Sequence, residues 1–258
     1  MTVISAVALM SNSRKSEISR RLNRMKIMLV LAGFLLMIAY FVISTSDMAQ
    51  AWEVLGVGTG SLIGGDLTDP EDDGNPEVDD GYNAIFSSND EPGFGGGEFA
   101  FNVFDNILGP SNDKWCCGPG GGIPEEGLYI TVELEEPAAL THFTVSSAND
   151  TPTRDPTNWA IQGSNDGENF TDIFSYEGDS LWPLRLQVVL FEAPEDFDVQ
   201  KTAYKYIRFV CYDTVANPAG AYYQVGEIEY FVGPGAAVDP KASLTTTWSR
   251  VKTNALSR

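Results

Sequence analysis

Residues 147–159 read SANDTPTRDPTNW, and residues 163–170 read GSNDGENF. In the second stretch, Asn165, Asp166 and Gly167 form a tight-turn sequence, because glycine supplies the positive φ that a turn between two strands needs. Trp159 and Ile161 are two positions apart just before this turn, so they share one face of the preceding strand. The pattern predicts a β-hairpin with Trp159 in the core.

Short apolar runs separated by turn residues continue the β pattern on both sides of this hairpin. The runs that we interpret as strands are residues 99–105, 128–134, 140–146, 158–163, 171–176, 186–191, 204–212 and 223–231. In one of them Ile207, Phe209 and Cys211 form an apolar face and Arg208 points the other way, which is typical of a half-buried strand. No long helical pattern interrupts the runs, so residues 52–232 are predicted to form an all-β, two-sheet jelly-roll sandwich.

The composition agrees with a β domain and limits its partners. Aromatic residues make up 11% of the chain, and 25 Gly and 14 Pro supply turns. The formal charge is 16 − 36 = −20. A surface of that sign repels phosphate backbones, which argues against nucleic acid and leaves cations, neutral ligands and basic proteins as partners.

Residues 1–51 have the pattern of an export segment. Basic residues between positions 14 and 26 precede an uncharged run at 27–46, and Ala-Gln-Ala follows at 49–51. These small residues are typical of a signal-peptide cleavage site before Trp52. An uncleaved membrane anchor is the alternative, and either one predicts a secreted or cell-surface protein with residues 52–258 outside.

The C-terminal residues 233–258 are predicted to be a linker followed by a short tail. Leu244, Trp248, Val251 and Ala255 recur at the spacing of an amphipathic helix, and the tail is basic where the domain is acidic. It is expected either to be a frayed terminus or to dock on an acidic face of the domain or on a protein partner.

The chain has three cysteines, which export would place in an oxidising compartment. Adjacent cysteines rarely bond each other, so we expect a disulfide from Cys116 or Cys117 to Cys211, leaving one thiol. A zinc site is the weaker alternative, because the chain has one histidine and no C-x-x-C pair.

The two opening stretches together resemble the coagulation-factor-5/8 type C, or discoidin-like, family, which includes many galactose-binding-like carbohydrate modules. Residues 104–115 resemble its early F-D-G…T-K-W segment, residues 206–209 its late Y-Y-R-L strand, and residues 226–229 its closing A-E-I-E strand. The resemblance covers residues 99–232 and implies a β-sandwich that holds sugars with loops at one end.

The resemblance also implies ligand-binding residues. Arg154 and Asn158 match the family's arginine and asparagine before the Gly-Ser-Asn-Asp-Gly turn, Asp150 lies beside them, and Trp182 is the expected aromatic platform. Guanidinium and amide groups suit vicinal hydroxyls. The alternative is that Arg154 pairs with Asp150 or Asp155 and braces its own loop.

A structural calcium ion is a further implication of the resemblance. Asp105 and Glu227 would donate carboxylates, with Asn112, Asp113 and nearby carbonyls completing a shell of about 6–8 oxygens. This sequence departs from the family at Asn106, where the family has glycine. The alternative is that Asp105 caps a turn and Glu227 is solvated.

A second calcium site is suggested by residues 69–80. Asp69, Glu71 and Asp73 fall at positions 1, 3 and 5 of a calcium loop, followed by Gly74 and, at position 12, Asp80. Asp69 and Asp73 are the predicted ligands, and a solvated acidic loop is the alternative.

No catalytic motif is evident in the sequence. There is no Gly-x-Ser-x-Gly elbow, and the one histidine, His142, lies in a predicted strand. We therefore expect an exported, non-catalytic module that binds glycans at a cell surface or in extracellular matrix. The alternative is a structural or adhesive surface protein that binds protein partners instead of sugar.

Overall fold

The computed structural model describes residues 52–91, 97–118, 122–216 and 222–233, together with helical positions at 21, 24–26 and 28. The chain divides into two compact units, residues 1–51 and 52–258. Among the described residues, no helix is long and apolar enough to cross a membrane. The proposed cleavage site and the basic tail lie outside the described residues, so both stay predictions.

The second unit is built from β-strands with three short 3-10 helices. The strands are β1 (Glu53–Val57), β2 (Ala84–Ser88), β3 (Trp115–Cys117), β4 (Leu128–Ala138), β5 (His142–Ser146), β6 (Pro156–Ser164), β7 (Thr171–Glu177), β8 (Gln187–Glu192), β9 (Tyr204–Thr214), β10 (Tyr223–Val225) and β11 (Ile228–Phe231). The 3-10 helices are η1 (Thr59–Ser61), η2 (Ala100–Val103) and η3 (Pro152–Arg154).

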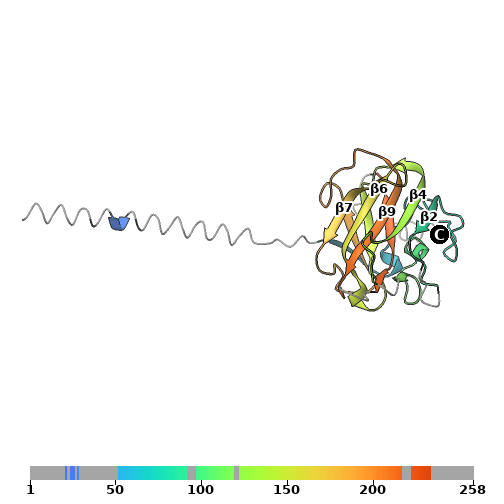
Figure 1. The fold of residues 1–258 in the computed structure, drawn as a ribbon, viewed down its shortest axis with the longest axis horizontal. Coiled ribbons are helices and arrows are strands. Elements are labelled where there is room, and N and C mark those ends of the chain that lie inside the picture. The colour runs from blue at the N-terminus through green and yellow to red at the C-terminus, as the bar shows by residue number, and fades with distance from the viewer. Residues whose placement is uncertain are drawn as a thin grey trace, which may run out of the picture. The chain divides into compact units, whose positions relative to one another are not determined.

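Two antiparallel sheets form the sandwich. One has the strand order β1-β8-β5-β11, and the other has the order β2-β4-β9-β6-β7, whose strands Figure 1 shows side by side. Strands β3 and β10 form a separate pair. The predicted all-β, two-sheet jelly roll is confirmed.

The opening stretch forms the predicted hairpin. Strands β6 and β7 pair antiparallel, with Gly163 opposite Thr171, and Gly167 between them has a φ of 74°. Trp159 is fully buried and stacks on Phe209 of β9, with the ring centroids 5.5 Å apart. The core prediction for Trp159 is confirmed.

Two of the predicted strands are not single strands in the structure. Residues 99–105 contain η2, where the Asn102 amide donates to the carbonyls of Gly97 and Asn112 and holds the chain in a turn. Residues 223–231 divide into β10 and β11 at Gly226, whose backbone lies so close to Ser147 that a Cβ would meet the Ser147 carbonyl oxygen at 2.6 Å.

The lead-in before β2 hydrogen-bonds along β11. The Leu67 amide donates to the Tyr230 carbonyl at 2.8 Å, and the Tyr230 amide donates to Asp66 Oδ2 at 2.8 Å. The Gly64 amide donates to Glu229 Oε1 at 2.7 Å. The acidic lead-in is therefore packed on the domain through buried carboxylates.

The disulfide prediction is wrong. Cys116 and Cys117 are bonded to each other, and Cys211 is a buried free thiol. Cys211 lies on β9, opposite Leu128 of β4 and Trp159 of β6, whereas the cysteine pair lies on β3 against β10. The sulfur atoms that we expected to bond therefore belong to different sheets.

Candidate ligand-binding site and carboxylate cluster

Arg154 is the last residue of η3, and one residue, Asp155, separates it from β6. Its Nη1 lies 3.5 Å from Cys116 Sγ and 3.4 Å from Cys117 Sγ, and its Cζ lies 5.3 Å from the centroid of the Tyr222 ring. Among the described residues no oxygen accepts a hydrogen bond from this guanidinium. The internal segments outside the described residues (92–96, 119–121 and 217–221) contain no Asp or Glu that could pair with it.

The bracing role that we considered for Arg154 belongs to another arginine. Arg185 donates to both carboxylate oxygens of Asp155 at 2.6 Å, and the Asp155 side chain is fully buried. Asp150 pairs with Lys114 at 3.2 Å. The alternative pairing of Arg154 with Asp150 or Asp155 is therefore wrong. The sequence carried no signal for Arg185, because its partner lies 30 positions away.

Trp182 is not available as an aromatic platform. Its side chain is 3% exposed, and its indole Nε1 donates to the Val145 carbonyl at 3.3 Å. The exposed ring beside Arg154 is that of Tyr222, which is 39% exposed, whereas its neighbour Tyr223 is fully buried. Strand alternation in the Tyr-Tyr pair was the sequence signal for Tyr222 that we missed.

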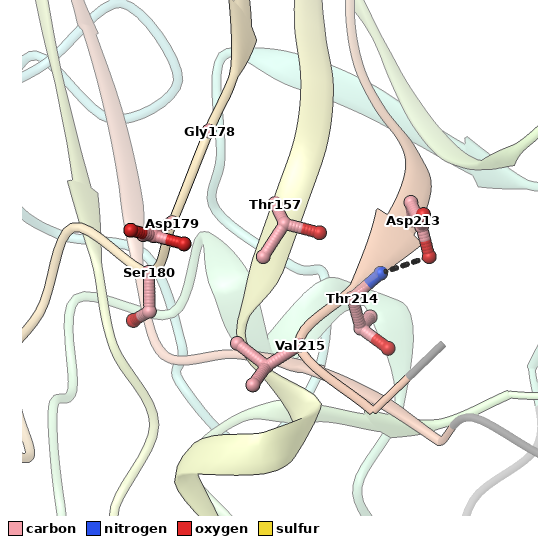
Figure 2. Close-up of a pocket in the computed structure, with 7 residues that line it drawn as sticks. All are labelled: Thr157, Gly178, Asp179, Ser180, Asp213, Thr214 and Val215. Carbon is pink, nitrogen blue, oxygen red and sulfur yellow. Dashed lines mark hydrogen bonds between the residues drawn. The ribbon is translucent and has the colours of Figure 1, made fainter. Parts of the chain in front are cut away.

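A polar groove lies next to the turn that carries Arg154. It has a volume of about 540 Å³ and is lined by Thr157, Gly178, Asp179, Ser180, Asp213, Thr214 and Val215 (Figure 2). The Val215 amide donates to the Asp155 carbonyl at 3.1 Å, which joins the groove wall to the η3 turn. The predicted residue Asn158 is half-buried on β6, adjacent to Thr157 and opposite Asp213.

The structure brings Asp105 and Glu227 together, and both are buried. Their carboxyl groups lie close enough to influence each other's pKa, and Glu227 Oε1 accepts the Asn106 amide at 3.1 Å. Within the described part of the chain, Glu227 Oε2 has no hydrogen-bond partner. Burial raises the pKa of Asp105 to about 8 and that of Glu227 well above its usual value, and the negative charges of neighbouring carboxylates add to both effects.

Comparison with known proteins decides the family. The sequence model described as the F5/8 type C domain matches residues 83–228. This chain belongs to the F5/8 type C domain family. No curated protein matches the chain.

Solved structures similar to this F5/8 type C domain include modules from Clostridium perfringens. One, a family 32 carbohydrate-binding module in complex with GalNAc-β-1,3-galactose, is 21% identical and covers 58% of this chain and 96% of its own, with a TM-score of 0.43. Another, the family 32 module of NanJ in complex with galactose, is 16% identical and covers 57% and 93%, with a TM-score of 0.42. At these identities the similarity concerns the fold alone.

The F5/8 type C resemblance implied a calcium ion, and two of its residues fit one. The unpaired Glu227 Oε2 against Asp105 is an arrangement that a buried cation would stabilise. Asp113 is half-buried, and its carboxylate lies so close to Gly109 that a Cβ at position 109 would collide with it. The negative charge of Asp113 is near enough to raise the pKa of Asp105. Asn112 is exposed, and its carbonyl accepts the Asn102 amide.

The remaining predicted calcium ligands precede the residues that match the F5/8 type C model. Asp69 is buried, and its oxygens accept the amides of Asp73 and Gly74 at 3.0 Å and the Asn106 side-chain amide at 3.3 Å. The Asp73 side chain is exposed. Asp69 thus ties its loop to the Asp105–Glu227 region, and a second calcium ion at Asp69 and Asp73 stays a prediction.

Proposed function

We propose that this F5/8 type C domain is a non-catalytic module that binds glycans through Arg154 and Tyr222. The observation that carries the proposal is the guanidinium of the half-buried Arg154, whose hydrogen-bond acceptors among the described residues are two sulfur atoms and which lies beside the Tyr222 ring. Sulfur is a weak acceptor, so the strong donors of Arg154 are available for the hydroxyl oxygens of a sugar.

The surroundings of Arg154 suit a sugar ring. The disulfide below and Tyr222 beside the guanidinium fix its position, so little side-chain freedom is lost on binding. The exposed face of Tyr222 offers an apolar surface for the C–H groups of a sugar. Asn158 and Asp150 supply further polar groups on the same loop and strand.

A non-catalytic role is supported by where the buried carboxylates with raised pKa values and the one histidine lie. Asp105 and Glu227, whose pKa values are raised, are buried in the cluster next to the lead-in and do not line the groove. His142 is 4% exposed and stacks on Phe231, with the ring centroids 4.6 Å apart. These groups serve packing and cation binding better than proton transfer to a ligand.

A structural calcium ion at Asp105 and Glu227 is part of the proposal. Bound there, the ion would neutralise two carboxylates that approach each other from distant parts of the chain, with Asp113 nearby. Because no three carboxylates among the described residues have their oxygens within 4.8 Å of one another, backbone carbonyls would complete the shell.

Export completes the proposed role, since residues 1–51 carry the signal or anchor pattern and a glycan-binding module acts at a cell surface or in matrix. Adhesion to protein partners through the basic tail stays the alternative. The tail lies outside the described residues.

The test is glycan binding by Arg154→Ala and Tyr222→Ala, measured on a glycan array and by calorimetry. Arg154→Ala is expected to weaken binding about tenfold or more, because it removes hydrogen bonds to a charged group. Tyr222→Ala is expected to weaken binding because it removes the apolar surface for the sugar, and both variants should show little change in melting temperature. Lys201→Ala removes an exposed cation elsewhere and serves as the matched control. Undiminished affinity in both variants, or no glycan binding by the wild-type protein, would contradict the proposal.

A further inference from the structure

We propose that the groove beside β6 is a second sugar-binding position. It binds a neutral sugar of the same glycan whose adjacent sugar contacts Arg154. This inference rests on the proposed function and deepens it. The ligand class that it names is a neutral saccharide of at least two residues.

The lining of the groove is chemically suited to hydroxyl groups. Figure 2 shows Thr157 between Asp179 and Ser180 on one side and Asp213 and Thr214 on the other. Carboxylates accept hydrogen bonds from hydroxyls, and hydroxyl side chains both donate and accept. The volume of about 540 Å³ lies within the range of small-ligand pockets, about 300–1,000 Å³.

One lining group lacks a partner. Thr214 is 2% exposed, and among the described residues its Oγ1 makes no hydrogen bond. A buried hydroxyl without a partner destabilises the folded protein, and native structures retain few of them. Because Thr214 Oγ1 is also shielded from solvent, a ligand in the groove does not reach it in this structure, and the lining groups that a glycan can contact are those of Thr157, Asp179 and Asp213.

The groove walls are held in place by the ion pair between buried Asp155 and partly exposed Arg185. Ser180 Oγ donates to Asp155 Oδ2 at 2.7 Å, and the Val215 amide donates to the Asp155 carbonyl at 3.1 Å. The Gly178 amide donates to the Thr157 carbonyl at 2.9 Å. A wall fixed before binding lowers the entropy cost of association, as expected of a built binding site.

The groove and Arg154 are joined by the same turn. Asp155 follows Arg154 directly, and the Ala216 amide donates to the Thr153 carbonyl at 2.9 Å. A ligand held at Arg154 therefore has a neighbouring polar groove within the same loop cluster. Consecutive residues of one glycan are the simplest occupant of two such adjacent positions.

The charges of the lining select for a neutral residue. Asp179 and Asp213 line the groove, and no lysine or arginine does. Uronic acids and sulfated sugars would place a second negative charge against these carboxylates, in a chain whose net charge is already −20. Neutral hexoses and N-acetylhexosamines carry the hydroxyl donors without that repulsion.

The experiment compares soluble neutral monosaccharides with their di- and trisaccharides, and with uronic acid dimers, by calorimetry. For the wild-type protein, we expect affinity to rise from mono- to disaccharide. The double variant Asp179→Asn, Asp213→Asn should lose about tenfold in affinity for the longer neutral glycans and keep its monosaccharide affinity. Glu177→Gln, which removes an exposed charge on β7 outside the lining, is the matched control.

A second variant guards against a folding defect. Thr157→Val keeps the side-chain shape and removes a hydroxyl that lines the groove, so it should leave the melting temperature nearly unchanged while lowering affinity for the longer glycans. Unchanged affinity for the longer glycans in this variant and in the double variant would overturn the inference.

The outcomes separate the two proposals. Monosaccharide binding that depends on Arg154, without any gain for longer glycans, would overturn the groove and leave the proposed function standing. Preference for uronic acid dimers, or calcium binding that the double variant abolishes, would also overturn it. A wild-type protein that binds no saccharide would overturn both.

Discussion

The pH dependence of stability should report directly on the Asp105–Glu227 cluster. Burial raises the pKa of Asp105 from 3.8 to about 8. Between these values the folded, metal-free protein binds more protons than the unfolded chain, so its free energy of unfolding falls as pH rises. The pKa difference of 8 − 3.8 = 4.2 corresponds to at most about 6 kcal/mol, and the part between pH 5 and pH 8 to about 4 kcal/mol.

The assay is chemical denaturation at pH 5, 6.5 and 8, with chelator and with calcium. In chelator, stability should fall across this range, because the Asp105 carboxyl loses its proton in a buried site. Calcium should remove most of the fall, since a cation bound only to the folded state stabilises the charged carboxylates. In Asp105→Asn, both the pH dependence above pH 6 and the calcium effect should shrink.

Asp66 supplies an internal check on this prediction. Burial raises the pKa of Asp66 to about 6, so its contribution to the fall in stability ends at a lower pH than that of Asp105. This contribution should remain in the Asp105→Asn variant. Asp198→Asn, at an exposed position, is the control for loss of one charge. Stability that stays constant from pH 5 to pH 8 in chelator, for protein shown to be metal-free, would refute the reasoning.

Two further predictions concern the cross-links of the loop end. Arg185→Ala leaves Asp155 buried without its cation and should lower the free energy of unfolding by about 3 kcal/mol, measured by chemical denaturation. Lys205→Ala, at the partly exposed pair with Glu133 at 3.9 Å, should lower it by less than about 1 kcal/mol. Equal losses in the two variants would count against the bracing role. Peptide mapping without reduction should find Cys116 and Cys117 unlabelled by a thiol reagent, and Cys211 labelled only after denaturation, because it is buried and burial raises its pKa; a linked peptide containing Cys211 would contradict the structure.

Local rules predicted the parts of the fold that depend on local sequence. The Asn-Asp-Gly turn and the alternation at Trp159 specify one hairpin, and that hairpin forms as expected. The run at 99–105 has the apolar content of a strand, yet the side chain of Asn102 reaches three backbone carbonyls and holds a 3-10 turn. Such contacts depend on where distant segments lie, so alternation alone does not predict them.

The candidate site shows the same division. The resemblance predicted that Asp105 and Glu227 would meet, and they do. The resemblance also predicted that Trp182 contacts the ligand, but the structure buries this side chain. A large aromatic ring in a loop can either face a ligand or fill the core, and the tertiary packing determines which of the two it does. The pairing of Arg185 with Asp155 likewise follows from the path of the loop between β7 and β8, which no sequence spacing specifies.

The packing of the lead-in on β11 has a consequence for edge-to-edge association of the domain. In its sheet, β11 is the last strand, and a strand at that position presents unpaired backbone groups that can recruit another chain. Asp66 accepts the hydrogen bond of the Tyr230 amide, and the Leu67 amide donates to the Tyr230 carbonyl. The carboxylates nearby oppose the approach of a second acidic domain. Residues outside the family match thus close an edge that would otherwise be open to edge-to-edge aggregation.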